Sequence, residues 1–222
     1  MTLKNYTMQQ IFEMLILPSL WATLKMLAIS GILSVIFGFI VGVILILTDK
    51  DGLSPNRVIY RILDIVVNII RSFPFIILMI SIIPLTRIIV GSSIGETAAL
   101  VPLTVAATPF MGRIFQSSFK EVDPALIEAA QSFGATKAQI VIKVMLVESV
   151  PSIVSGISLG IINLLGPPLW QALSEQADWA QPPLHTAIRT LMKKIMYSIV
   201  VILIILVAVI QFLGDWLYKK LK

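Results

Sequence analysis

The sequence contains no cysteine and only one histidine among its 222 residues. The absence of cysteine excludes disulfides, thiolate metal sites and thiol catalysis. Charged residues are scarce as well: they make up 13% of the chain, about half the share in an ordinary soluble domain. Histidines and carboxylates do not cluster at catalytic spacing anywhere, so the sequence predicts neither an enzyme nor a metal site.

The sequence also lacks the G-x-x-x-x-G-K-[ST] phosphate loop, so this chain is not expected to bind ATP in the usual way. A ring-forming filter motif, which would indicate an ion channel, is missing too. No internal repeat or low-complexity tract is evident, which favours a single domain over residues 1–222. The N-terminus does not read as a cleavable signal, so the first apolar run is expected to stay in the protein as an anchor.

Apolar residues dominate what is present. They make up 57% of the chain, and the mean hydropathy is +0.95. A helix that crosses a membrane needs about 20 such residues in succession. The sequence therefore predicts an all-α integral membrane protein with five transmembrane helices, at about 20–48, 58–84, 96–117, 139–165 and 195–217.

Glycine and proline give these spans individual features. The first span carries Gly31, Gly38 and Gly42 at intervals that place small residues toward a neighbouring helix and allow its backbone to come close. Proline removes a backbone hydrogen bond inside a helix and bends it. We therefore expect kinks at the prolines within the second and third spans, which are Pro74, Pro102 and Pro109.

The basic residues indicate the orientation. If the loop at 49–61 is cytoplasmic, ten of the 17 Lys and Arg residues fall on the cytoplasmic side, as the positive-inside rule requires. The N-terminus is then outside and the C-terminus inside. The net charge of +5 is explained by this topology, and no nucleic-acid partner is expected.

A polar loop at about 120–138 separates the third and fourth spans and contains the stretch EAAQSFGATKAQ at 128–139. Asp123 can cap a helix that starts at Pro124, the residue best tolerated at that position. Gly134 follows where a left-handed residue would end the helix, and Thr136 can cap the next one. The loop is therefore predicted to be a short helix, a sharp turn and the start of the fourth span.

The composition of this short helix favours docking. Ala129 and Ala130 form a surface without bulk, on which a partner can pack closely, and Glu128 offers a carboxylate to orient it. The competing interpretation is an ordinary solvated connector, and the spacing alone does not separate the two.

The pattern E-A-A, three residues, then G resembles the EAA loop of binding-protein-dependent ABC importer permeases. NIIRSFPFIIL at 68–78, IPLTRIIVGSSIG at 83–95 and AALVPLTVAATPF at 98–110 are similar to the methionine-importer permease subgroup. The resemblance implies a type I ABC importer permease fold and a cytoplasmic coupling loop that docks on an ATPase subunit. The coupling residues it implies are Glu128, Ala129, Ala130, Gly134 and Ala135.

The same resemblance implies a function. The chain would be the permease subunit of a methionine importer in the bacterial cytoplasmic (inner) membrane, working by alternating access. It would act as a homodimer among membrane lipids, with an extracytoplasmic substrate-binding lipoprotein and an ATPase subunit that uses ATP and magnesium, and would need no cofactor of its own. Two alternatives stay open: the same machine carrying another small amino acid or peptide, and a non-transporting scaffold that recruits a cytoplasmic protein. The substrate-binding residues are not identified.

Charged and polar residues inside the second span form an intramembrane polar stripe. Asp64, Asn68 and Arg71 are spaced i, i+4 and i+7, which places them on one helical face. Either Arg71 braces a helix break before Pro74, or the stripe lines a transport pathway. We favour the first interpretation, because a methionine zwitterion carries no net charge and needs no fixed buried cation.

The segment 167–194 departs from the rest. The family resemblance stops at about residue 166 and resumes at Ile195, and the segment holds Trp170, Trp179 and the chain's only histidine. It could be a lineage-specific insertion, a designed graft or a frame error. Read from the third base of each codon, one permitted back-translation gives a Gly- and Ala-rich string like that of related permeases. We therefore hypothesise a pair of compensating frameshifts around it.

Overall fold

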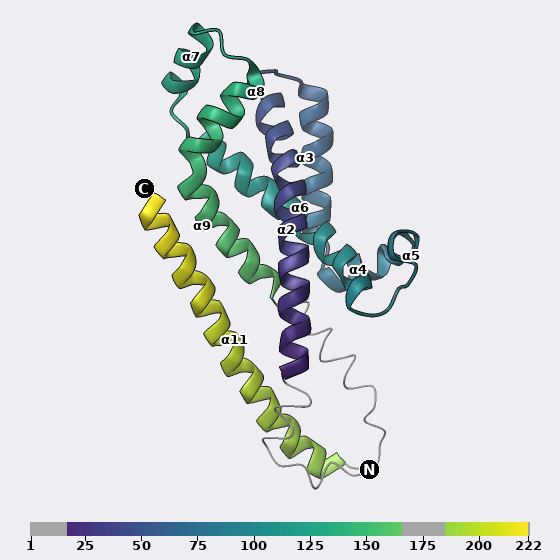
Figure 1. Cartoon of the computed structure of the whole chain (residues 1–222). Helices are drawn as coiled ribbons and strands as arrows, with labels where there is room; N and C mark the ends of the chain where they lie inside the picture. Colours follow the sequence, from purple (N-terminus) through teal and green to yellow (C-terminus); the bar gives the residue numbers. More distant parts are fainter. Residues whose placement is uncertain (1–16, 166–184, 222) are drawn as a thin grey trace.

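The computed structural model describes residues 17–165 and 185–221, and every regular element within these ranges is a helix. The chain forms an elongated bundle in which α2 and α6 cross near the centre (Figure 1). The expectation of an all-α protein is confirmed. The helices are α2 (Leu17–Thr48), α3 (Arg57–Ser72), α4 (Phe75–Ser81), α5 (Ile83–Val90), α6 (Glu96–Lys120), α7 (Pro124–Ser132), α8 (Lys137–Gln139), the π-helix η3 (Ile140–Met145), α9 (Leu146–Leu164) and α11 (His185–Leu221).

Small residues set the distance between α2 and α6. A Cβ atom on Gly42 would lie 2.5 Å from the Cβ of Phe115 and 2.9 Å from the carbonyl oxygen of Gly112. Gly38 faces Met111 in the same way. The prediction that glycines of the first span admit a neighbouring helix is therefore confirmed for Gly38 and Gly42. For Gly31 it stays a prediction, since an added Cβ there would meet no atom of this chain within 4 Å.

The second predicted span is broken rather than continuous. Helix α3 ends at Ser72, and α4 starts at Phe75 in a direction bent by 111°. Pro74 is the physical reason, since it lacks the N–H that would continue the helix and holds Phe73 in an extended conformation (φ −75°, ψ 130°). The expected kink at Pro74 is confirmed, and it separates two helices rather than bending one.

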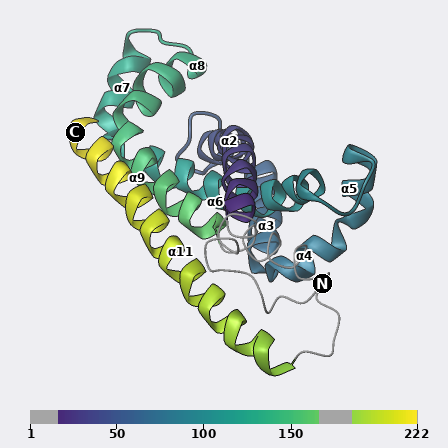
Figure 2. The same cartoon turned by 60° about the horizontal axis from the view of Figure 1, so that its bottom comes forward.

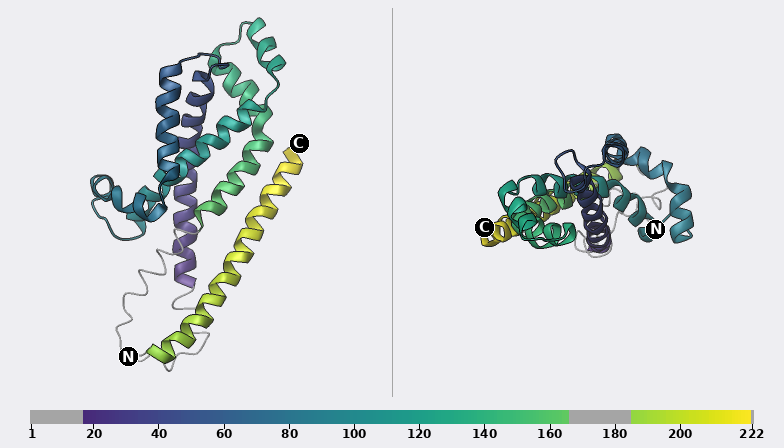
Figure 3. Two further views of the ribbon diagram at one scale, coloured as in Figure 1. Left: turned by 180° about the vertical axis from the view of Figure 1, so that it is seen from behind. Right: turned by 90° about the horizontal axis from the view of Figure 1, so that it is seen from above.

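Beyond the break, α4 and the unexpected α5 form an arm. The arm extends from the bundle on the side away from α11 (Figures 2 and 3). It carries exposed apolar side chains, among them Ile76, Ile88 and Ile89. Helix α5 ends at Gly91, whose φ of +80° favours glycine. Helix α6 then returns to the bundle and runs uninterrupted through Pro102 and Pro109.

Three helices in the described part of the chain are long and apolar enough to cross a membrane, and the bent pair α3 and α4 would be a fourth. The three begin and end within a few residues of the predicted first, third and fourth spans. The fifth predicted span, 195–217, lies inside α11, so its helical state is confirmed. Most of the anomalous segment, residues 167–184, lies outside the described residues.

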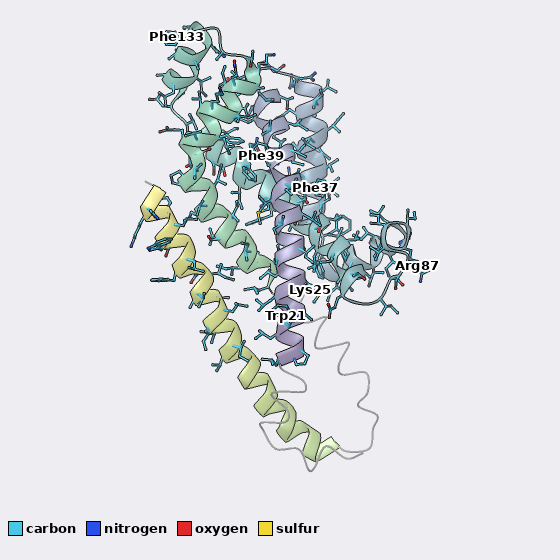
Figure 4. The ribbon with its side chains drawn as sticks, viewed as in Figure 1. Trp21, Lys25, Phe37, Phe39, Arg87 and Phe133 are labelled. Carbon is cyan, nitrogen blue, oxygen red and sulfur yellow. The ribbon has the colours of Figure 1, made fainter. Side chains whose placement is uncertain are left out.

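The two ends of the bundle differ. The α2–α3 loop and the α7 loop lie together at one end, while α2 begins near the other (Figure 1). Trp21, 71% exposed, and Lys25 mark that second end, and Phe133 marks the tip of the first (Figure 4). Tryptophan at a helix end is typical of a membrane–water boundary. The bundle thus has the length and polarity of a membrane-spanning unit.

Candidate functional site

The loop between α6 and α9 has the local structure that its sequence predicts. The side chain of Asp123 accepts a hydrogen bond from the Ala125 N–H at 2.9 Å, and Pro124 is the first residue of α7. At the far end, Gly134 has a φ of +76°. Thr136 forms a reciprocal capping box with Gln139, with bonds of 3.3 and 2.8 Å. All three boundary predictions are confirmed.

The residues of α7 differ in how far they are exposed. None of its side chains is buried, and Glu128 and Ala129 are exposed at the surface. Ala130 and Ala135 instead lie half-buried against the apolar cluster beneath the loop. The small surface available to a partner is therefore centred on Ala129 rather than shared by both alanines.

Phe133 was missed by the sequence analysis. Its side chain is 91% exposed at the tip of the molecule, immediately before Gly134 (Figure 4). Covering an exposed aromatic ring with a partner surface removes apolar area from water and lowers the free energy. The available signal was a phenylalanine within the stretch 128–139, which is otherwise polar or small. Together with Glu128 and Ala129 it makes α7 suited to docking.

The loop stands on a rigid base. Phe115, Phe119, Val122, Ile140 and Met145 are buried together where α6, η3 and α9 meet. The rings of Phe115 and Phe119 each meet the Phe39 ring of α2 edge to face, with centroids 5.3 and 6.4 Å apart, and meet each other in a tilted contact at 6.1 Å. Because Val122 and Ile140 flank the loop, this packed cluster connects α7 to the bundle.

An ion pair joins the loop's root to the neighbouring loop. Lys120, the last residue of α6, lies 2.5 Å from the Asp49 carboxylate at the end of α2. The Asp49 side chain is only 11% exposed. Burial raises the pKa of Asp49, but hydrogen bonds from Lys120 and from the Lys50 N–H and the Lys120 charge outweigh it and hold the pKa below its ordinary value.

Two residues of the predicted polar stripe on α3 are bound by an arginine of α6. Asn68 donates a hydrogen bond to Asp64 at 3.2 Å, so the two share a face as expected. The partner of Asp64 is Arg113, which also donates to Asn68 at 3.0 Å and to Gln116 at 2.8 Å. The sequence analysis counts Arg113 only among the ten basic residues of the cytoplasmic side. Spacing along the chain does not reveal a partner 49 residues away.

Arg71, the third member of the stripe, is not part of this network. Its guanidinium lies 6.0 Å from the centre of the Phe110 ring of α6. Arg71, Arg113 and Lys120 all line a cavity of about 340 Å³ between α3 and α6. The structure thus brings Asp64 and Asn68 together and leaves Arg71 apart from them.

Long apolar helices, an apolar surface and a polar network between α3 and α6 are features of an integral membrane protein. The family of binding-protein-dependent transport system inner membrane components matches over residues 34–222, and the chain belongs to this family.

Relatives with assigned names agree with the family. The chain is 41% identical over 206 residues to a probable D-methionine transport system permease protein from Vibrio cholerae, covering 93% of this chain and 92% of the relative. It is 45% identical over 159 residues to the D-methionine transport system permease protein of Salmonella typhi, covering 72% and 73% of the two chains.

Solved structures show the same fold. A chain of the MetNI methionine ABC transporter, in an inward-facing conformation, superposes with a TM-score of 0.86 at 35% identity, over 98% of this chain and 100% of that one. An amino acid ABC transporter with histidines shares the fold at a TM-score of 0.60 and 18% identity, over 89% and 88%.

Proposed function

We propose that this chain is the membrane-spanning permease subunit of an ATP-driven methionine importer. The observation that carries the proposal is the capped α7 helix, which has no buried side chain and an exposed face, on an apolar bundle. Relatives that match along nearly their whole length are named as methionine permeases, which supports the choice of cargo. The chain itself is a transporter subunit rather than an enzyme.

The proposal extends to the partners, and the likeness to the MetNI methionine ABC transporter supports it. A separate ATPase subunit docks on Glu128, Ala129, Gly134 and the exposed Phe133, and pulls the loop as nucleotide binds. The permease works as a homodimer with an extracytoplasmic substrate-binding protein, in the bacterial inner membrane. Alternating access between two states of the dimer needs a free-energy difference of a few kcal/mol that the partners can reverse.

The topology that suits this machine has five spans, with the N-terminus outside and the C-terminus inside. The α2–α3 loop and the α7 loop are joined by the Asp49–Lys120 ion pair, which supports placing both on the cytoplasmic side. Basic residues at these loops, including Lys50, Arg57 and Lys137, agree with the positive-inside rule. Helix α11 supplies the fifth span.

Reconstitution tests the proposal. The chain is placed in liposomes with its ATPase subunit and binding protein, and uptake of radiolabelled methionine is measured with ATP. ATP-dependent uptake that requires the binding protein is expected. Uptake of another amino acid in preference to methionine would assign a different cargo, while ATPase docking without any flux would identify a scaffold.

Docking is tested in the same liposomes. Glu128→Lys reverses the charge on the exposed face of α7, and Phe133→Ala removes the ring. Both should insert normally and yet lower uptake per ATP hydrolysed. Arg87→Gln on α5, far from α7 (Figure 4), serves as the control that keeps wild-type coupling.

A further inference from the structure

The cavity between α3 and α6 carries an inference that rests on the proposed function and goes beyond it. Its volume is about 340 Å³, within the range of small-molecule sites. Three cations line it, and two of them are neutralised: Arg113 pairs with Asp64, and Lys120 pairs with Asp49. Among the described residues, no carboxylate lies within 4.0 Å of Arg71, the third cation.

Arg71 is held at the edge of an apolar wall. Its guanidinium lies 6.0 Å from the centre of the Phe110 ring, and Ile114 lines the cavity one turn further along α6. Arg71 is the penultimate residue of α3, just before the break at Pro74, and its side chain is exposed beside the bend of the span. A charged group at membrane depth is costly unless it faces water or an opposite charge.

We propose that Arg71 receives the carboxylate of the amino-acid cargo, and that Phe110 and Ile114 contact the cargo's apolar side chain. A guanidinium binds a carboxylate through two parallel hydrogen bonds, which fixes both position and direction. Arg113 and Lys120 do not compete for the cargo's carboxylate, since Asp64 and Asp49 already hold them. The site therefore selects small amino acids by one anionic group and one apolar group.

This assignment revises the sequence-based interpretation of Arg71 as a brace for the helix break. The break is explained by Pro74 alone, because proline removes the hydrogen bond at this point. The side chain of Arg71 makes none of the hydrogen bonds of the Asp64–Asn68–Arg113 network. It is free to bind a ligand.

The test measures binding to the permease–ATPase complex in lipid nanodiscs, without nucleotide or binding protein. The probes are radiolabelled methionine and methioninamide, which keeps the side chain and ammonium group but lacks the carboxylate. The variant is Arg71→Gln. The matched control is Arg61→Gln, which removes an exposed arginine from the same helix outside the cavity.

Arg71→Gln should bind methionine at least tenfold more weakly than the wild type, because a charged hydrogen-bonded pair is lost. It should bind methioninamide as the wild type does, and Arg61→Gln should bind both probes normally. Unchanged methionine affinity in Arg71→Gln would overturn the proposal. So would an equal loss for both probes, or an absence of methionine binding to the wild-type complex.

A phospholipid phosphate is the other anion within reach of a membrane arginine. Native mass spectrometry of the same complexes distinguishes it: a phospholipid retained by the wild type and lost by Arg71→Gln, with methionine affinity unchanged, would assign the site to lipid. Wild-type uptake in liposomes, measured in parallel, tests the proposed function separately. Uptake by the wild type with no effect of Arg71→Gln on binding or uptake would reject this site and leave the importer intact.

Discussion

Lys120 and Asp49 connect the last turn of α6 to the end of α2 across 2.5 Å, at the end of the bundle that carries α7 (Figure 1). The two residues lie 71 positions apart in the sequence, yet they hold the two loops of this end together. The Asp49 side chain is nearly buried, so the charge of Lys120 offsets the free-energy cost of removing its carboxylate from water. The contact makes the root of the docking loop part of the bundle.

Asp49→Asn is therefore expected to loosen this root. Loss of a hydrogen bond between charged groups costs about 1.5–3 kcal/mol, and thermal unfolding of the protein in detergent should report it. Lys50→Met is the control, since the Lys50–Asp51 pair is more than 80% exposed on both sides and such pairs contribute little. Equal melting temperatures for Asp49→Asn and Lys50→Met would contradict the expectation.

The contribution of Asp49 should depend on pH in a defined direction. Its pKa in the folded protein lies below the ordinary 3.8, so the folded state favours the ionised form. The stabilisation is then complete above about pH 5 and is lost as the pH falls below 3.8 through the folded pKa. The difference in melting temperature between wild type and Asp49→Asn should be flat near neutrality and shrink in acid. A difference that grows on acidification would show the opposite sign.

Gly134→Val should uncouple ATP hydrolysis from uptake. The φ of +76° is strained for a branched residue by about 1–2 kcal/mol, whereas the space around a new Cβ is open. The effect is thus one of backbone conformation, and Gly134→Asn, which tolerates this conformation, should retain more coupling. ATP hydrolysed per methionine imported is the measurement. Normal coupling in Gly134→Val would count against a docking role for this turn.

Gly42→Leu should separate α2 from α6. An added side chain would meet the Gly112 carbonyl, which is backbone and moves only with its helix, so we expect a cost of about 1–3 kcal/mol. Gly31→Ala, on the same helix but in open space, should be neutral or slightly stabilising. Unfolding in detergent compares the two. A Gly42→Leu protein as stable as Gly31→Ala would refute the close packing.

The coding DNA tests the hypothesis about segment 167–194. Compensating frameshifts require that the third-base frame of this segment encode a Gly- and Ala-rich string. Sequencing the gene from its source and reading that frame is sufficient. A third-base frame interrupted by stop codons, or encoding an unrelated string, would leave an insertion or a graft as the explanation.

The parts of the fold that the sequence predicted depend on local chemistry. Asp123, Gly134 and Thr136 each act on neighbours within a few residues, so their caps and turn are readable from the chain. Pro74 marked the break in the same way. The direction of the chain after Pro74, and with it α5, is set by packing against α6, which no local signal encodes.

The site shows the same division. Asp64 and Asn68 were placed on one face by their spacing, and the structure confirms it. Their pairing with Arg113 joins helices far apart in the sequence, and a single sequence contains no record of it. Ala130 was expected at the surface beside Ala129, but adjacent helical residues point about 100° apart, so one of the two turns inward.

The π-helical turn at Ile140–Met145 holds one residue more than an α-helical turn would. Deletion of one residue within this turn is expected to convert it to ordinary α-helix and to leave the face that α9 turns toward α6 unchanged. The same deletion further along α9 would instead rotate the rest of that helix by about 100°. The turn is therefore a place where the length of the chain can change by one residue without repacking the bundle.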